Sequence, residues 1–193
     1  MSARLIYVLG PSGAGKDSVL AWLKADIACS PKVNAQVYWT RRSITREVVA
    51  GGEPHENLNV ATFEKLQTAG EFVMSWKANG LSYGIRREEL IPLQRGGWVF
   101  VNGSRAYLQT ATQLFPELLV LHITASPQSL RERLLLRGRE SRESIDARLQ
   151  RTADLGPLQH PRMIEVSNDQ NLEETGQAVL AHLMQLPEWP QAR

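Results

Sequence analysis

Cysteine is nearly absent from this chain of 193 residues, because Cys29 is the only one. A single thiol excludes an intramolecular disulfide. Long apolar runs are also missing, and no stretch approaches the roughly 18 residues that a membrane-spanning helix needs. The first apolar run leads straight into a glycine-rich turn, and a signal peptide would instead have a longer apolar region and a cleavage site. We therefore expect a cytoplasmic protein with no membrane partner.

Excess charge is lacking as well, since 22 basic residues face 20 acidic ones and the net charge is +2. This balance gives no case for a nucleic-acid partner, and no basic stripe with interleaved aromatic residues is present. Arginine, in contrast, is abundant and provides 17 of the 22 basic residues. Its planar fork binds phosphate oxygens in pairs, which suits phosphorylated ligands. A high-GC genome would also raise the arginine content, so the composition alone does not decide the kind of ligand.

The most informative stretch begins at Gly10 and reads Gly-Pro-Ser-Gly-Ala-Gly-Lys-Asp-Ser. It follows an apolar run and precedes a helical pattern, which is the context of a phosphate-binding loop. Glycines allow close approach to an anion, the helix N-terminus attracts it, and Lys16 reaches the β and γ phosphates. The loop departs from the usual pattern at Asp17, where Ser or Thr is normal. The residues predicted to bind the nucleotide are Gly10, Pro11, Ser12, Gly13, Ala14, Gly15, Lys16, Asp17 and Ser18.

Apolar strand patterns alternate with helical patterns along the chain. This alternation predicts an α/β protein with a parallel sheet, helices on both faces and right-handed crossovers. We expect the main strands at residues 4–9, 33–42, 98–101, 118–123 and 163–166. We expect the main helices at residues 17–28, 105–114, 127–136, 141–151 and 172–186. Between residues 42 and 96 the patterns are shorter: helix 61–69, strands 71–76 and 81–85, and helical residues 86–94, with a polar loop at 49–59.

Further candidate residues lie outside the loop. Arg42 and Arg46 belong to an arginine-rich turn that can hold a second phosphorylated group. Asn102, Ser104 and Arg105 follow a strand, and the carboxyl ends of parallel strands face the ligand crevice. His55 and Glu56 are adjacent in sequence and are therefore a poor metal site.

In this order the motifs resemble those of the nucleoside monophosphate kinases, and of guanylate kinase above all. The phosphate loop, Thr45-Arg46, Gly70-Glu-Phe72, Tyr83-Gly84, Arg133-Leu-Leu-Leu-Arg137-Gly and Val166-Ser-Asn-Asp169 carry the resemblance. It implies a P-loop NTPase fold with a five-stranded parallel sheet. It also implies one kinase domain over residues 1–193, with an acceptor-binding insert at about 42–96 and a lid at about 133–150.

Three residues typical of those kinases are replaced, including the two acids that read guanine. Met74 stands in place of a glutamate, Asn102 in place of an aspartate, and Val49 in place of an arginine. A pocket that has lost the side chains that hydrogen-bond to a base no longer selects that base strongly. The replacements therefore disfavour a guanine nucleotide as the acceptor.

The replacements match a narrower pattern instead. Gly-Lys-Asp-Ser, Ile44-Thr-Arg46, the segment from Gly51 to Glu56, the segment from Ser75 to Gly84 and Val101-Asn-Gly-Ser-Arg105 resemble the ribose 1,5-bisphosphate phosphokinase family. Glu47 departs from it, because a proline is frequent there. The resemblance implies transfer of the γ-phosphoryl group of ATP to ribose 1,5-bisphosphate, in phosphonate degradation, by a monomer or homodimer.

The resemblance also implies the roles of the site residues. Lys16, Arg133, Arg137 and Arg148 are expected to act on the transferring phosphoryl group, and Arg42, Arg46, Tyr83, Asn102, Ser104 and Arg105 on the acceptor. Mg²⁺ is the expected cofactor. Since Asn102 replaces the strand-end acid, Asp17 is the predicted carboxylate for the metal, unless it only stabilises the helix dipole. Two alternatives stay open: a guanylate kinase with relaxed acceptor choice, and a non-catalytic guanylate-kinase-like binding module.

Overall fold

The computed structural model of the chain describes residues 2–47, 54–138, 141–154 and 156–191. Three segments named above lie wholly or partly outside these ranges: position 49, residues 51–53 of the polar loop, and residues 139–140 of the lid. Among the described residues, no helix combines the length and the apolar character needed to cross a bilayer.

The main sheet has five strands in the order β2-β7-β1-β8-β9. These strands are β1 (Leu5–Leu9), β2 (Val37–Trp39), β7 (Trp98–Asn102), β8 (Leu119–Thr124) and β9 (Met163–Ser167). The pairs β2–β7 and β8–β9 are parallel. Every residue of β1 and β7 is buried, as expected for strands covered on both faces. The structure thus confirms the predicted α/β fold with a five-stranded parallel sheet.

The chain divides into two compact units. Unit 1 comprises the described residues of Met1–Tyr7 and Gln36–Leu118, and unit 2 comprises those of Val8–Ala35 and Leu119–Arg193. The phosphate loop belongs to unit 2, and the short elements between residues 42 and 96 belong to unit 1.

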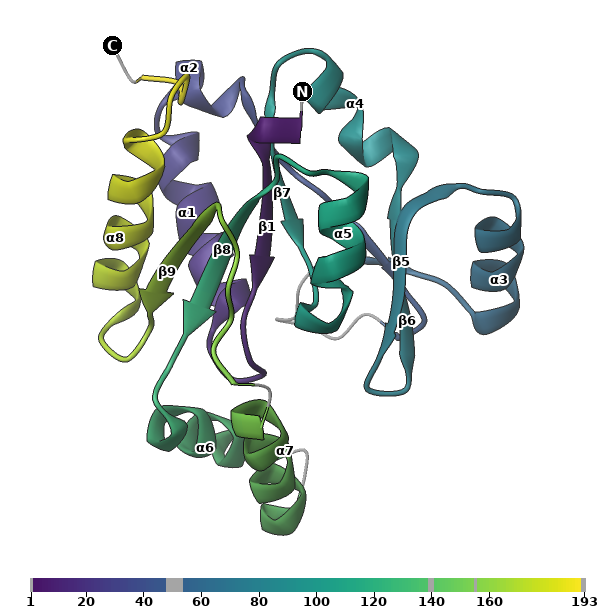
Figure 1. Cartoon of the computed structure of the whole chain (residues 1–193), viewed down its shortest axis with the longest axis vertical. Helices are drawn as coiled ribbons and strands as arrows, with labels where there is room; N and C mark the ends of the chain where they lie inside the picture. Colours follow the sequence, from purple (N-terminus) through teal and green to yellow (C-terminus); the bar gives the residue numbers. More distant parts are fainter. Residues whose placement is uncertain (1, 48–53, 139–140, 155, 192–193) are drawn as a thin grey trace. The chain divides into compact units, whose positions relative to one another are not determined.

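In unit 2, helices α1 (Lys16–Ala28) and α8 (Leu172–Met184) lie side by side (Figure 1). Gly176 of α8 leaves room for the Trp22 ring of α1, because a Cβ at this position would overlap that ring. A second pair of helices, α6 (Pro127–Leu136) and α7 (Arg142–Asp154), also packs together (Figure 1). As predicted, α6 has proline at its first position, and the hydroxyl of Ser126 caps it. A short helix, α2 (Pro31–Asn34), follows α1.

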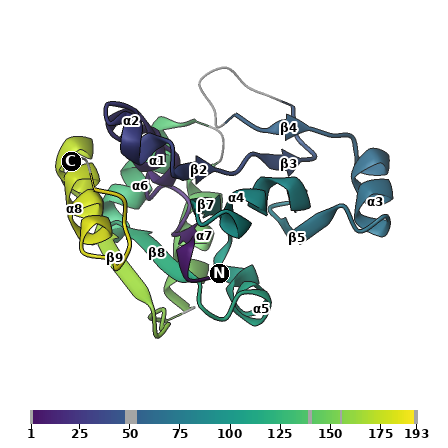
Figure 2. The ribbon, with the colours of Figure 1, turned by 90° about the horizontal axis from the view of Figure 1, so that it is seen from above.

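Unit 1 contains a second sheet in the order β4-β3-β6-β5. Figure 2 labels three of its strands, β3, β4 and β5. Its strands are β3 (Arg42–Ile44), β4 (Glu56–Asn57), β5 (Phe72–Ala78) and β6 (Leu81–Arg86), and helix α3 (Val60–Thr68) packs beside β5. Asn79 and Gly80 have φ angles of 51° and 75° and form the tight turn between β5 and β6, the two strands that the sequence predicts at 71–76 and 81–85. The remaining described helices of the unit are η1 (Ser2–Arg4), η2 (Arg87–Leu90), α4 (Ile91–Gln94), η3 (Arg105–Tyr107) and α5 (Leu108–Leu114).

Two local predictions were wrong. Residues 33–42 do not form one strand, because Pro31 after the extended residue Ser30 starts helix α2, and because β2 and β3 join different sheets. Glu56 and Asn57 were expected in a polar loop, but they pair with β3 as strand β4. A strand of two residues is too short to show the alternation of apolar and polar residues that predicts a strand. It is recognised only from its pairing with β3.

Candidate active site

The loop between β1 and α1 has the geometry of an anion-binding turn. Gly15 adopts a left-handed conformation (φ 83°) at the N-cap of α1, and no side chain caps the helix there. A helix N-terminus without a side-chain cap is a favourable place for an anion. The Nζ atom of Lys16 donates to the carbonyl oxygens of Gly10 (2.8 Å) and Pro11 (3.2 Å). Gly10 has no room for a Cβ, since the Ile123 carbonyl lies against it.

A cavity of about 340 Å³ adjoins this turn in unit 2. It is lined by Gly13, Gly15, Ser18, Arg133, Leu136, Arg137, Asn168, Gln170 and Leu172. The Nη2 atom of Arg133 donates to the Asn168 carbonyl at 2.6 Å. Its Nη1 atom is buried and has no hydrogen-bond partner among the described residues. A guanidinium beside an uncapped helix N-terminus favours a polyanion such as a nucleotide phosphate chain.

The third predicted lid arginine reaches the loop from another helix. Arg148 of α7 donates from Nη1 to the hydroxyl of Ser12 at 3.2 Å. An exposed ion pair between Arg131 and Asp146 (3.1 Å) links α6 to α7. The structure therefore brings Arg133, Arg137 and Arg148 to the same region of unit 2 as Lys16.

Asn168, in the turn after β9, is the buried centre of this region. Its Nδ2 donates to the carbonyl of Ala14 at 2.7 Å, and its Oδ1 accepts from the hydroxyl of Thr175 at 3.0 Å. Gly15 must lack a Cβ because the Asn168 amide lies against it. The neighbouring Asp169 accepts from the Ser167 hydroxyl and the Ser126 amide, and these hydrogen bonds hold the pKa of its carboxyl well below the usual range. One turn thus joins the phosphate loop to α6 and α8.

Asp17 and Ser18 lie in the first turn of α1, and both are exposed. Ser18 lines the cavity of unit 2. Within the described ranges, no three His, Cys, Asp or Glu side chains gather closely enough to hold a metal ion.

In unit 1 three predicted acceptor residues lie together. The guanidinium of Arg42, at the start of β3, lies 5.2 Å from the centroid of the Tyr83 ring, and its Nη1 donates to the Asn102 carbonyl at 3.4 Å. The Tyr83 ring in turn stacks on the Trp76 ring, with 5.6 Å between their centroids, and the centroids of the Trp76 and Tyr107 rings lie 5.5 Å apart. The cation–π contact with Tyr83, whose ring is itself packed on Trp76, helps to orient the Arg42 side chain.

The turn after β7 carries Ser104 and Arg105 and is held by Tyr7. The Tyr7 hydroxyl donates to the Ser104 carbonyl (3.1 Å) and accepts from the Ser104 amide (2.9 Å). Gly103 has no space for a Cβ, because the Tyr7 ring packs against it. Burial raises the pKa of Tyr7, so the phenol stays protonated and keeps both hydrogen bonds. Arg105 lies half-buried at the start of η3.

Arg46 follows β3 in the same unit. Its Nε atom is buried and has no hydrogen-bond partner among the described residues. Its carbonyl contacts Nε2 of His55 at 2.9 Å. A larger cavity of unit 1, about 660 Å³, contains none of the predicted site residues; it is lined by Glu71, Val73, Arg86, Arg87, Glu88, Leu90, Ile91, Leu93, Gln94 and Phe115.

Sequence reasoning missed the residues that support the site. Tyr7 and Trp76 have the apolar pattern of ordinary strand residues, and neither was predicted as a site residue. Asn168 did have a signal, since it follows the last strand of a parallel sheet, where polar residues face the ligand crevice.

No protein-family model matches the chain. Among curated proteins, the ribose 1,5-bisphosphate phosphokinase PhnN of Pseudomonas paraeruginosa is 43% identical over 183 residues, which cover 95% of this chain and 96% of that protein. The ribose 1,5-bisphosphate phosphokinase PhnN of a Janthinobacterium species is 40% identical over 184 residues. The match covers 95% of this chain but only 40% of that longer relative.

Among solved structures, the guanylate kinase of Anaplasma phagocytophilum matches with a TM-score of 0.66. The alignment covers 97% of this chain and 88% of that one, at 15% sequence identity. At this identity the likeness shows the fold alone, which is the P-loop NTPase fold of the guanylate kinases.

Proposed function

Because this chain belongs to the ribose 1,5-bisphosphate phosphokinase family, we propose that it transfers the γ-phosphoryl group of ATP to ribose 1,5-bisphosphate. The products are 5-phosphoribosyl 1-diphosphate and ADP, as in phosphonate degradation. The relationship over 95% of the chain carries the proposal. A cytoplasmic location fits an enzyme that uses ATP, and its partners are small molecules.

The donor half of the reaction belongs to residues of unit 2. Lys16 and the N–H groups of the loop would hold the β and γ phosphates, with the Lys16 ammonium exchanging loop carbonyls for phosphate oxygens. Arg133, Arg137 and Arg148 would stabilise the charge on the transferring phosphoryl group, because each lies by the loop or its cavity. The buried Nη1 of Arg133 supports this role, since an anion would give it a partner.

The acceptor half belongs to residues of unit 1. Arg46 and Arg42 would bind acceptor phosphate, Tyr83 would donate a hydrogen bond to it, and Asn102, Ser104 and Arg105 would contact the ribose or its 5-phosphate. A phosphate oxygen of the acceptor attacks the γ phosphorus, and the bond to the β–γ bridging oxygen breaks. The acceptor phosphate is already ionised, so positioning and charge stabilisation suffice without a general base. From the motifs that resemble those of the guanylate kinases, we infer one kinase domain over residues 1–193, with an insert at about 42–96 and a lid at about 133–150.

Mg²⁺ fits the oxygen donors at the start of α1. Mg²⁺ in kinases is held by one or two protein oxygens together with substrate phosphates, and the exposed Asp17 carboxylate and Ser18 hydroxyl provide such oxygens. Asp17 would act directly or through water. The ion would neutralise phosphate charge on the donor nucleotide.

Product analysis by phosphorus NMR tests the proposal directly. The enzyme is incubated with Mg-ATP and ribose 1,5-bisphosphate, and we expect diphosphate signals of a sugar 1-diphosphate together with ADP. A Lys16→Ala variant serves as the control and should form neither. Absence of a sugar diphosphate with the wild-type enzyme would reject the proposed acceptor.

The fold shared with guanylate kinases makes GMP the acceptor to compare. A coupled assay of ADP release is run with GMP and with ribose 1,5-bisphosphate at equal concentrations. We expect release with the sugar bisphosphate and little with GMP. Release with GMP alone would identify a guanylate kinase, and release with neither would indicate a binding module.

A further inference from the structure

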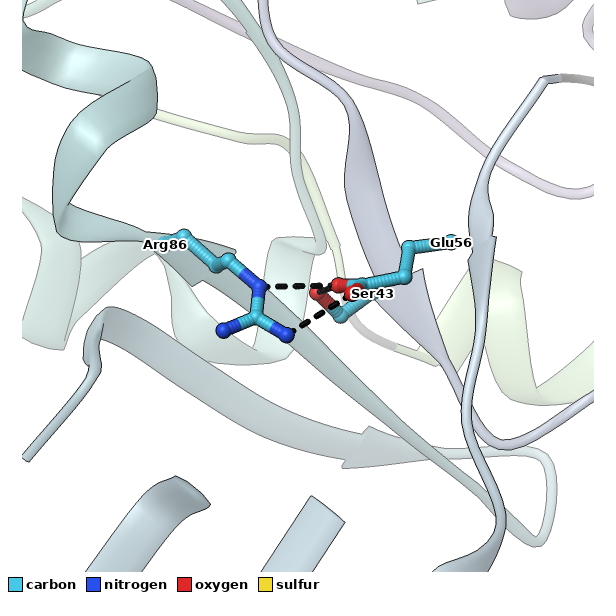
Figure 3. Close-up of polar contacts among 3 residues, drawn as sticks. All are labelled: Ser43, Glu56 and Arg86. Atoms are coloured by element: carbon cyan, nitrogen blue, oxygen red, sulfur yellow. Dashed lines mark hydrogen bonds and ion pairs between the residues drawn. The ribbon is translucent and has the colours of Figure 1, made fainter. Parts of the chain in front are cut away.

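Glu56 joins three strands of the small sheet in unit 1. Its carboxylate receives two parallel hydrogen bonds from Arg86, at 2.8 Å from Nε and 2.7 Å from Nη2, and a third from the Ser43 hydroxyl at 2.5 Å (Figure 3). Both side chains are mostly buried, with 25% of Glu56 and 20% of Arg86 exposed. The hydrogen bonds from Arg86 hold the pKa of Glu56 below its ordinary value. A carboxylate so bound is fixed in position.

Residues next to Glu56 also form backbone contacts with β3 and with Arg46, which follows that strand. Glu56 pairs in parallel register with Ser43, and the Leu58 amide donates to the Ile44 carbonyl at 3.0 Å. His55 is only 8% exposed, and its Nε2 lies 2.9 Å from the Arg46 carbonyl. A carbonyl oxygen only accepts, so Nε2 of His55 is the donor. Strand pairing and hydrogen bonds from residues 55–58 thus hold the backbone from Ser43 to Arg46 in place.

The side chain of Arg46 contrasts with its fixed backbone. Its Nε is buried without a hydrogen-bond partner among the described residues. A buried guanidinium nitrogen in this state is costly unless a ligand pairs with it. A backbone held by hydrogen bonds and a buried Nε donor without a partner together indicate that Arg46 is positioned to bind an anion.

We propose that Glu56 and His55 are positioning residues that set Arg46 for the acceptor phosphate. They act through the backbone and touch no substrate. The proposal rests on the proposed function, which assigns Arg46 to the acceptor. It explains the His55-Glu56 pair that the sequence left without a role.

The test compares Michaelis constants for ribose 1,5-bisphosphate and ATP in the Glu56→Gln variant. We expect the acceptor KM to rise about tenfold or more and the ATP KM to change little, because a small displacement of a binding group costs this much. Glu64→Gln on the exposed face of α3 is the matched control and should change neither constant. Equal changes in both constants, or a loss of stability alone, would overturn the proposal.

A double-mutant cycle separates positioning from general packing. If Glu56 acts through Arg46, then Glu56→Gln should add nothing to the acceptor KM of an Arg46→Lys variant. Additive effects would show that Glu56 acts elsewhere. If Glu56→Gln does not fold, Ser43→Ala removes one hydrogen bond and should change the acceptor KM in the same direction by less.

A second readout needs no enzymatic activity, so failure of the proposed function stays distinguishable. In ¹⁵N NMR spectra the Arg46 Nε–H signal is assigned by its loss in Arg46→Lys. We expect this signal to be sharp and slow to exchange in the wild type and in Glu64→Gln, and to broaden in Glu56→Gln. An Arg46 signal that is the same in all three would refute the positioning role.

Discussion

Replacing Asn168 by alanine tests how the phosphate loop is held. The change removes the donor to the Ala14 carbonyl at 2.7 Å and the acceptor for the Thr175 hydroxyl at 3.0 Å. Thr175 keeps a second partner, the Asn171 carbonyl at 3.1 Å, so the Ala14 carbonyl is the group left unpaired. An unpaired buried carbonyl costs about 2 kcal/mol. In a protein of this size, that loss corresponds to a fall in melting temperature of about 4–8 °C.

The same substitution should also weaken the donor site. The Ala14 carbonyl belongs to the loop, so its displacement should raise the KM for ATP while the acceptor KM stays nearly constant. Circular dichroism measures the melting temperature, and steady-state kinetics measures both constants. Thr175→Ser keeps the hydroxyl and serves as the control. A variant with wild-type melting temperature and wild-type ATP KM would refute the reasoning.

Three further outcomes follow from the site. Tyr7→Phe removes both hydrogen bonds to the Ser104 backbone; it should cost about 1–3 kcal/mol in chemical unfolding and raise the acceptor KM but not the ATP KM. Asp17→Asn and Asp17→Ser should raise the Mg²⁺ concentration needed for half-maximal rate more than the acceptor KM, and unchanged Mg²⁺ dependence in both would reject a metal role. The lowered pKa of Glu56 stabilises the folded state fully above the ordinary pKa of 4.5; this contribution disappears as pH falls through the lower folded value, so Glu56→Gln should flatten the acid side of a stability–pH curve.

Local patterns were sufficient to predict most elements. The loop Gly10–Ser18, the Ser126-Pro127 start of α6 and the Asn79-Gly80 hairpin each depend on residues close in sequence, so each could be read directly. Strand β4 depends on a partner in β3 and could not be read this way.

The contacts that support the site could not be predicted from local sequence patterns either, because they also join residues far apart in the sequence. Asn168 and Ala14 lie 154 positions apart, and Tyr7 and Ser104 lie 97 positions apart. No periodicity or motif links such residues, and only the packed chain brings them together. The sequence therefore indicates which residues can bind phosphate, whereas the structure shows what holds the loop and the turn in place.

The burial of Met74 limits how this insert can be remodelled. Met74 is 1% exposed, on the same strand as the buried Phe72 and Trp76. A glutamate at this position would place a carboxylate on the buried side of the strand, which is strongly unfavourable unless a cation or a hydrogen-bond donor meets it. A change toward base recognition thus cannot begin at Met74 alone.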